Sequence, residues 1–463
     1  MTLAKTEKQT TGRINSVPEL AVNSVAEWTA GEYLSMLQSR QVTATQYMTA
    51  CLDRIEQLEP NLHAWHIYDP DLALQRAAEI DAAFAKGTPL KALSGVPVGV
   101  KDIYNTYDFP TGMGSKIMDG YTPGNDARIV SDIRLDDGIV VGKTVTAEFA
   151  VHHPGPTVHP LDKARSPGTS SSGSAVAVAS RMVPVALASQ TAGSIIRPAS
   201  YCGIYGYKPS FGLLPRTGVL KTTDTLDSLG FMARSIEDLR LLFERCRVRG
   251  HNYPISETAL QDETRQTIGS RPWKIGVVQG PKTEFETPEA KAGLDAAVSR
   301  LAAAGCEVTD FRLPGEFDAI HDIHERIYSR ALAYYFNLEW NADKTLFSET
   351  MQNMIESGLT VEPAQYQDDV HRQTQLSRQI DKAMTGVDIL IGLSTAGEAP
   401  TGLGAADLPD HCLIWTTCGM PAISVPALKG RDGLPVGIQI VGRRYNDYLL
   451  LAFADHLQAV LAE

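Results

Sequence analysis

The N-terminal part of the chain shows apolar residues at helical spacing. Residues 24–86 contain three such stretches and predict three helices. The last opens at Pro70, a residue favoured in the first turn, and Gly87 fits its C-terminal cap. We expect residues 1–23 to form a loose arm. Residues 1–16 are polar and lack an apolar stretch, so we expect no signal peptide. The pattern therefore predicts a helical N-terminal flank over residues 24–90.

From residue 94 onward the apolar runs become short, β-branched and bounded by glycine, as in buried strands. The clearest runs are residues 95–100 and 138–142, which flank a helical stretch at 126–135. A strand, a helix and a strand on this spacing predict a βαβ unit and hence parallel pairing.

Strands and helices continue to alternate toward the C-terminus. The pattern predicts strands at residues 273–279, 307–312, 388–393, 421–426 and 435–441. It predicts helices at 288–304 and 447–461 and a mostly helical region over residues 314–385, with aromatic residues clustered at Tyr334, Tyr335, Phe336 and Trp340. We expect a single domain over residues 1–463, of the α/β class, with a central mixed, twisted β-sheet surrounded by α-helices.

Composition and charge limit the partners. Of the 463 residues, 43% are hydrophobic and 21% are charged, which is typical of a globular chain. The net charge of −12 repels phosphate backbones and anionic lipids, so we expect neither a nucleic acid nor a membrane as partner. The six cysteines form no C-x-x-C pair, which favours free thiols in a reducing cytoplasm.

Three common site motifs do not occur in the sequence. A Ser-His-Asp hydrolase of the α/β class would show G-x-S-x-G before a helix, and this chain has none. Residues 142–144 end like a phosphate-binding loop, but Asp137 stands where the first glycine is needed. His321 and His324 lie three positions apart with no third ligand suggested, so we expect a solvated helix face and no metal.

A lysine and two serine-bearing segments remain as candidate chemistry. Lys101 ends an apolar strand, residues 164–174 form a small, polar loop between core segments, and Ser194 follows another apolar strand. A serine hydroxyl is a weak nucleophile and needs a base. Burial can lower the pKa of a lysine from about 10.4 to roughly 7–8, which makes the amine a base. Glycine and alanine next to Ser194 leave backbone N–H groups free to face an oxyanion.

Two alternatives stay open at this point. In one, Lys101 pairs with Asp102 at the surface and the serines only cap helices. In the other, the base is a histidine from the proline-rich loop near residues 152–160, which contains His152, His153 and His159.

The segments that bear these residues resemble the amidase signature family. The similarity is dense from about residue 95 to 242 and resumes over residues 388–442. The matching segments are GVPVGVKD (95–102), RSPGTSSSGS (165–174), QTAGSIIRPA (190–199), CGIYGYKP (202–209), GMPAISVP (419–426) and GLPVGIQ (433–439). Together they are highly specific, and they imply the amidase signature fold with a signature core at residues 95–245.

The resemblance implies a Ser–cis-Ser–Lys triad and no metal or cofactor. Ser194 would attack the carbonyl carbon, Ser170 would follow a cis peptide bond and relay the proton, and Lys101 would take it. The implied oxyanion hole consists of the N–H groups of Thr191, Ala192, Gly193 and Ser194. The implied supporting residues are Ser171, Gln190 and Arg197.

Four positions depart from the commonest form of the family. Gln190 and Ala192 stand where aspartate and glycine are usual, a form that a subset of the family shares. Alanine adopts positive φ less easily than glycine, which bears on the geometry of the oxyanion hole. Thr169 and Ser172 replace glycines of the serine loop, and their β-carbons narrow it.

The family implies hydrolysis of a C–N bond in a small amide, aryl amide or carbamate (urethane), through an acyl-enzyme on Ser194 in a cytoplasmic protein. A homodimer would follow family habit. The variable helical region 314–385 and the loop 109–121 would shape the substrate pocket, with candidate lining residues Met113, Tyr121, Ile414 and Trp415. One alternative is the amidase subunit of a glutamine-dependent tRNA amidotransferase, which needs a partner subunit. Another is an inactive binding protein of the same fold, which retention of the whole triad disfavours.

Overall fold

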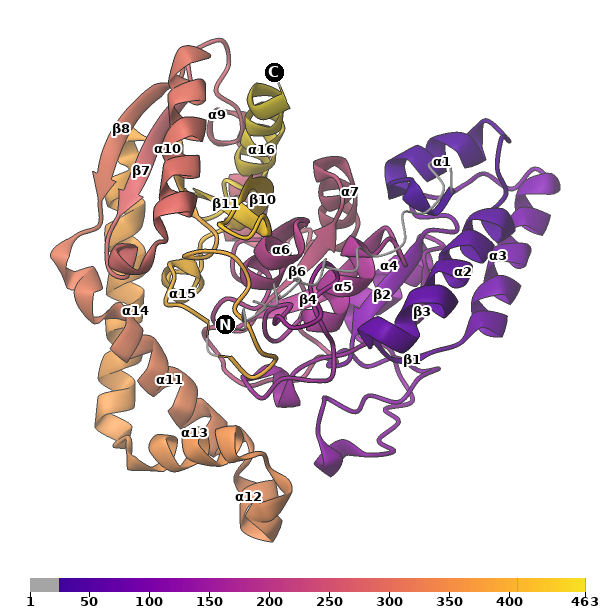
Figure 1. The fold of residues 1–463 in the computed structure, drawn as a ribbon, viewed down its shortest axis with the longest axis horizontal. Coiled ribbons are helices and arrows are strands. Elements are labelled where there is room, and N and C mark those ends of the chain that lie inside the picture. Colours follow the sequence, from indigo (N-terminus) through magenta and orange to yellow (C-terminus); the bar gives the residue numbers. More distant parts are fainter. Residues whose placement is uncertain (1–24, 406, 463) are drawn as a thin grey trace, which may run out of the picture.

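A computed structural model describes residues 25–405 and 407–462. These residues form one central sheet covered by helices (Figure 1). Its eleven strands follow the order β1-β3-β2-β4-β6-β5-β10-β11-β9-β7-β8. The arm expected at residues 1–23 lies outside the described residues. The strands are β1 Trp65–Tyr68, β2 Pro97–Lys101, β3 Ile139–Thr144, β4 Val185–Gln190, β5 Tyr205–Lys208, β6 Ser228–Ala233, β7 Lys274–Gln279, β8 Glu307–Arg312, β9 Ile389–Leu393, β10 Ala422–Lys429 and β11 Pro435–Gly442.

Helices surround this sheet, and within the described ranges none is long and apolar enough to cross a membrane. The α-helices are α1 Ala30–Gln38, α2 Ala44–Leu62, α3 Pro70–Ala85, α4 Arg128–Leu135, α5 Ser172–Ala179, α6 Ile196–Cys202, α7 Ile236–Cys246, α8 Pro254–Gln261, α9 Glu263–Gln266, α10 Pro288–Ala303, α11 Ile320–Tyr335, α12 Asn337–Asp343, α13 Glu349–Thr360, α14 Pro363–Ala383, α15 Cys412–Thr417 and α16 Asp447–Ala462.

The sheet is mixed, as the sequence predicts. Strands β3, β2 and β4 are parallel neighbours, as are β8, β7 and β9, and the other pairs are antiparallel. The predicted βαβ unit is confirmed as β2, α4 and β3. The sequence missed β1, β5 and β6. Of these, β1 and β5 are four residues long, too short to show a period of two.

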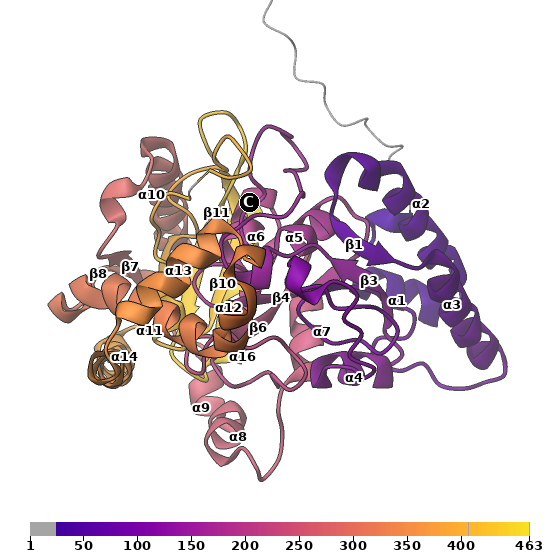
Figure 2. The same cartoon turned by 90° about the horizontal axis from the view of Figure 1, so that it is seen from below.

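Both faces of the central strands are covered, which explains their unbroken apolar sequences. In β4, Val185 and Leu187 join one apolar cluster with α4, α7 and α16, whereas Ala186 and Ala188 join another with α2, α3 and α5. The three N-terminal helices predicted from the sequence lie at the β1 end of the sheet, and α10 lies at the β8 end (Figures 1 and 2).

The region 314–385 is helical, as predicted, and builds a third apolar cluster. Helices α13 and α14 both pack on α11 there, and the cluster extends to Ile196 at the start of α6. Phe336 is buried and Trp340 packs against the same cluster, but Tyr334 is 73% exposed. Tyr335 also packs against this cluster, and the exposed Tyr334 contacts Tyr335 edge-on, with ring centroids 5.2 Å apart.

The carboxyl ends of β2, β3 and β4 meet at one edge of the sheet, because these strands run parallel. Lys101 is the last residue of β2 and is paired with Thr144, the last residue of β3. Gln190 ends β4, shortly before Ser194. Segments that are far apart in the sequence thus converge on one place.

Replacing Gly142 by alanine should lower the free energy of unfolding by about 1–3 kcal/mol, as overpacking does. A β-carbon at this position of β3 would lie 2.6 Å from Cα of Tyr68 in the paired strand β1, and backbone cannot easily yield. Urea unfolding followed by tryptophan fluorescence measures the change. Gly315→Ala is the control, since its β-carbon would meet nothing within 4 Å. Equal stability of the two variants would contradict the prediction.

Candidate active site

Lys101 lies at the centre of the candidate site and is completely buried. Its Nζ lies within hydrogen-bond distance of three hydroxyl oxygens, those of Ser170 at 2.8 Å, Ser171 at 2.9 Å and Ser189 at 2.8 Å. The alternative of a surface pair between Lys101 and Asp102 is wrong, because both residues are buried and the Asp102 carboxylate binds Lys143 instead.

Burial sets the charge of this amine. Loss of hydration disfavours the ammonium form and holds the pKa of Lys101 well below its usual value, although the charge of Asp227 acts in the opposite direction. Hydroxyl groups can donate to a neutral amine as readily as they accept from one. The surroundings of Lys101 therefore suit a neutral base.

Lys143, on the adjacent strand β3, shows the contrasting arrangement. It is also completely buried, and its Nζ lies 2.9 Å from the Asp102 carboxylate. The same Nζ donates to the Thr111 hydroxyl at 2.8 Å. Burial lowers the pKa of Lys143, and the charge of Asp102 opposes that shift. This pair anchors the loop that leads to Met113, beside the carboxyl end of β2.

The serine loop presents Ser170 and Ser171 to Lys101. The peptide bond between Thr169 and Ser170 is cis, as the family resemblance implies. Ser171 also donates its hydroxyl to the carbonyl oxygen of Ser189 at 3.2 Å, which ties the loop to the end of β4. The loop ends directly in α5, which begins at Ser172, so both serines are held by a rigid element.

Ser194 lies in the tight turn between β4 and α6 and is 8% exposed. The side chain of Gln190 holds this turn from within. Its Oε1 accepts hydrogen bonds from the N–H groups of Ile195 at 2.8 Å and Ile196 at 3.0 Å. Its Nε2 donates to the hydroxyl of Thr416 at 2.9 Å.

Three carbonyl groups of the same turn, those of residues 191–193, accept hydrogen bonds. The Thr191 oxygen lies 2.9 Å from Nε2 of His324, the Ala192 oxygen accepts from the Thr416 hydroxyl at 2.7 Å, and the Gly193 oxygen accepts from the N–H of Arg197 at 2.9 Å. In residues 25–405 and 407–462 no group accepts a hydrogen bond from the N–H groups of residues 191–194. These donors are thus available to a ligand oxygen.

Arg197 explains why Gly193 has no side chain. A β-carbon at Gly193 would lie 2.8 Å from Nη2 of Arg197. The guanidinium itself is fixed by two carboxylates, Asp410 at 2.8 Å and Asp407 at 3.1 Å. Arg197 therefore packs directly beneath the turn that bears Ser194.

Of the four candidate pocket residues, three are buried in one apolar cluster and one is exposed outside it. Met113, Ile414 and Trp415 are 8%, 0% and 1% exposed and belong to the same apolar cluster as Ile196, next to the Ser194 turn. Tyr121 is 40% exposed and does not belong to that cluster. Met113, Ile414 and Trp415 are therefore part of the apolar cluster that extends to the start of α6.

The histidines take places that the sequence did not indicate. The expectation of a solvated helix face at His321 and His324 is wrong for His324, which is 3% exposed and points at the Thr191 carbonyl. His159 is buried with Nε2 2.9 Å from the Tyr201 carbonyl oxygen, whereas His152 and His153 are exposed. No histidine hydrogen bond to Ser170 or Ser194 is found in the described part of the chain.

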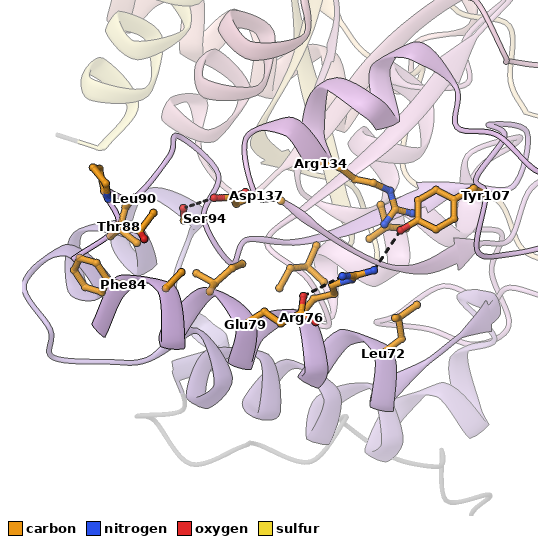
Figure 3. Close-up of a pocket in the computed structure, with 16 residues that line it drawn as sticks. Leu72, Arg76, Glu79, Phe84, Thr88, Leu90, Ser94, Tyr107, Arg134 and Asp137 are labelled. Atoms are coloured by element: carbon orange, nitrogen blue, oxygen red, sulfur yellow. Dashed lines mark hydrogen bonds and ion pairs between the residues drawn. The ribbon is translucent and has the colours of Figure 1, made fainter. Parts of the chain in front are cut away.

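A separate cavity of about 380 Å³ lies between α3 and the amino ends of β2 and β3 (Figure 3). Its charged residues are paired with one another or with neighbours. Arg76 contacts Glu79 at 2.9 Å, and Arg134 contacts Asp108 at 2.7 Å. Lys101 lies at the opposite end of β2, so this cavity is not part of the candidate site.

Comparison with known proteins agrees with this geometry. The Amidase family model matches residues 46–451. The chain belongs to the amidase signature family. A glutamyl-tRNA(Gln) amidotransferase subunit from Rhodococcus erythropolis is 32% identical, over 90% of this chain and 94% of that protein. The equivalent subunit from Koribacter versatilis is 29% identical, over 92% and 97%.

Solved structures of other amidases share the fold. The native peptide amidase of Stenotrophomonas maltophilia is 26% identical, with a TM-score of 0.80 over 94% of this chain and 97% of that chain. A bacterial aryl acylamidase has a TM-score of 0.80 at 22% identity, which shows the fold alone. This amidase signature protein is thus an amidase-family hydrolase, with an α/β fold common to enzymes of different substrates.

Replacing Asp102 by asparagine should lower the free energy of unfolding of this amidase by about 3–5 kcal/mol, because it leaves the buried Lys143 ammonium without its counter-charge. Chemical denaturation measures the loss. In a double-mutant cycle, Lys143→Met added to Asp102→Asn should recover part of it. Additive losses from the two substitutions would show that the pair does not act as a unit.

Proposed function

We propose that this protein is an amidohydrolase that cleaves the C–N bond of a small amide, aryl amide or carbamate through an acyl-enzyme on Ser194. The observation that carries the proposal is the buried Lys101 amine, which contacts Ser170, Ser171 and Ser189. Among the described residues, no acidic group lies within hydrogen-bond reach of this amine. Such an amine is a base that a serine hydroxyl can use.

The reaction begins with attack by Ser194 Oγ on the carbonyl carbon. The Ser194 proton passes to Ser170, whose own proton passes to Lys101. The N–H groups of residues 191–194 stabilise the oxyanion of the tetrahedral intermediate, and one such donor is worth roughly 3–4 kcal/mol. The C–N bond then breaks as the proton returns through Ser170 to the leaving nitrogen. Water hydrolyses the ester on Ser194 by the same proton path.

The remaining contacts give the other residues their roles. Ser171 holds the serine loop against the end of β4 and orients the Lys101 amine. Gln190 fixes the turn that bears Ser194, and Arg197 packs beneath it. No step needs a metal ion or an organic cofactor, because the neutral lysine is the base and the backbone N–H donors stabilise the oxyanion.

The substrate class rests on the apolar wall beside Ser194. Met113 and Ile196 belong to a large cluster of buried hydrophobic side chains that continues into the helices α11, α13 and α14. An apolar or aryl acyl group fits such a wall, since ligand sites are lined mainly by hydrophobic side chains. A carbamate forms the same type of tetrahedral oxyanion as an amide.

A second candidate is the amidase subunit of a glutamine-dependent tRNA amidotransferase. The observation that favours it is the 32% identity, over 90% of this chain, to the amidotransferase subunit from Rhodococcus erythropolis. Such a subunit requires a partner, whereas a stand-alone hydrolase does not.

A fluorophosphonate probe should label Ser194 of the purified chain, as mapped by mass spectrometry. Lys101→Ala and Lys101→Arg should lose labelling by about 10⁴-fold or more, because a Ser–base unit fails as a whole. Arginine keeps a positive charge but cannot lose its proton, so Lys101→Arg tests whether position 101 must act as a base. Label on Ser170, or full labelling of Lys101→Ala, would refute the assigned roles.

The pH dependence of labelling tests the charge of the amine. Burial lowers the pKa of Lys101, so the neutral base is already present well below pH 10.5. We expect the labelling rate to rise with pH as Lys101 loses its proton and to reach its plateau well below pH 10.5. A rate that still rises tenfold per pH unit near pH 10 would show that Lys101 keeps an ordinary pKa.

Assays without a partner separate the two candidate functions. The chain alone should hydrolyse p-nitroacetanilide and p-nitrophenyl N-methylcarbamate, with turnover abolished in Ser194→Ala. Glutamine hydrolysis that exceeds aryl amide hydrolysis would instead favour the amidotransferase role.

A further inference from the structure

The variable helical region contacts the turn that bears Ser194. His324 lies on helix α11 and is 3% exposed. Its Nε2 lies 2.9 Å from the carbonyl oxygen of Thr191. The hydroxyl of the same threonine donates to the Asp227 carboxylate at 3.0 Å. Thr191 is therefore fixed through both its side chain and its carbonyl group.

Because the peptide unit is planar, the hydrogen bond between His324 and the Thr191 carbonyl also orients the N–H of Ala192. The carbonyl of Thr191 and the N–H of Ala192 belong to one planar unit, and in a trans peptide they point in opposite directions. The bond to His324 therefore sets the direction of the Ala192 N–H. By the same reasoning Thr416 sets the N–H of Gly193, through the Ala192 carbonyl.

The charge of His324 suits this role. Burial lowers its pKa to about 4, with the nearby His152 and His321 acting in the same direction and the bond to Thr191 opposing them. The imidazole is thus neutral at ordinary pH. A carbonyl oxygen only accepts, so the hydrogen of the ring lies on Nε2.

The neighbouring tyrosine holds the ring in place. Tyr328, one turn along α11, packs edge-on against His324 with ring centroids 5.8 Å apart, and it is buried. The ring of Tyr328 also lies near that of His152, with ring centroids 6.4 Å apart. The imidazole of His324 is therefore confined by packing as well as by its hydrogen bond.

We infer that His324 is a positioning residue that aims the Ala192 N–H at the substrate oxyanion, so that the variable helical region forms part of the oxyanion hole's support. This inference rests on the proposed function, since it assigns a task to the N–H groups of residues 191–194. His324 acts through Thr191 and touches no reacting atom.

The test compares three variants by their rate of fluorophosphonate labelling at Ser194. His324→Leu removes the donor, whereas His324→Gln keeps an amide donor near the position of Nε2. His159→Leu is the matched control. His159 is also a buried histidine with Nε2 2.9 Å from a backbone carbonyl oxygen, but that oxygen belongs to Tyr201, outside the turn. Thermal unfolding of each variant establishes that it is folded during the assay.

We expect His324→Leu to label about 10- to 100-fold more slowly, as small misplacements of catalytic groups cost that much. His324→Gln should stay within a few fold of the original chain, and His159→Leu should label at the original rate. With an aryl amide substrate the loss should lie in kcat and leave KM nearly unchanged.

The outcomes are distinguishable. Equal labelling of His324→Leu and the original chain, or an equal loss in His159→Leu, would overturn the role of His324. An equal loss in His324→Gln would also do so, because the donor would then not matter. Absence of label on Ser194 in the original chain would overturn the proposed function itself. If His324→Leu does not fold, His324→Asn, whose shorter amide cannot reach Thr191, replaces it with the same expected loss.

Discussion

The site depends on the burial of one amine without a counter-charge. Lys101 and Lys143 lie on adjacent strands, both completely buried, yet only Lys143 of the two has a carboxylate partner among the described residues. Burial lowers the pKa of both lysines, but the charge of Asp102 opposes that shift at Lys143. Lys101 instead lies within hydrogen-bond distance of three serine hydroxyl groups, which carry no charge to stabilise its ammonium form. Asp102, the next residue after Lys101, thus pairs with Lys143, and Lys101 has no carboxylate within ion-pair distance among the described residues.

Sheet topology brings the partners of Lys101 together. The parallel strands β2 and β4 end side by side, so Ser189 near the end of β4 lies beside Lys101. The serine loop enters α5 directly from this edge, and the Ser194 turn enters α6 from the end of β4. Ser194 is therefore carried by a short turn between β4 and α6, and Ser170 and Ser171 directly precede α5, which limits their motion. Rigid support of this kind is what proton transfer across hydrogen bonds requires.

The sequence predicted much of this because the decisive residues stand in local patterns. The strand ending at Lys101, the small-residue loop around Ser170 and the turn at Ser194 are each continuous segments, and the family resemblance joins them. It could not predict contacts between distant segments. His324 is separated from Thr191 by 133 positions and Thr416 from Ala192 by 224, and neither residue stands in a motif. The pairing of Asp102 with Lys143 was missed for the same reason, since adjacent charged residues suggested a pair between Lys101 and Asp102.

The departure at Gln190 and Ala192 has a physical explanation in Thr416. An aspartate at position 190 could accept the N–H groups of Ile195 and Ile196, as Gln190 does, but it has no N–H to offer. The glutamine amide donates to the Thr416 hydroxyl, which directs the hydroxyl hydrogen toward the carbonyl oxygens of Ala192 at 2.7 Å and Cys412 at 3.1 Å. A hydroxyl that already accepts from Gln190 is a better donor, because such bonds polarise one another. Gln190 thus helps to hold the Ala192 carbonyl, and with it the next N–H. Ala192 does not have a positive φ, so alanine fits this position without backbone strain.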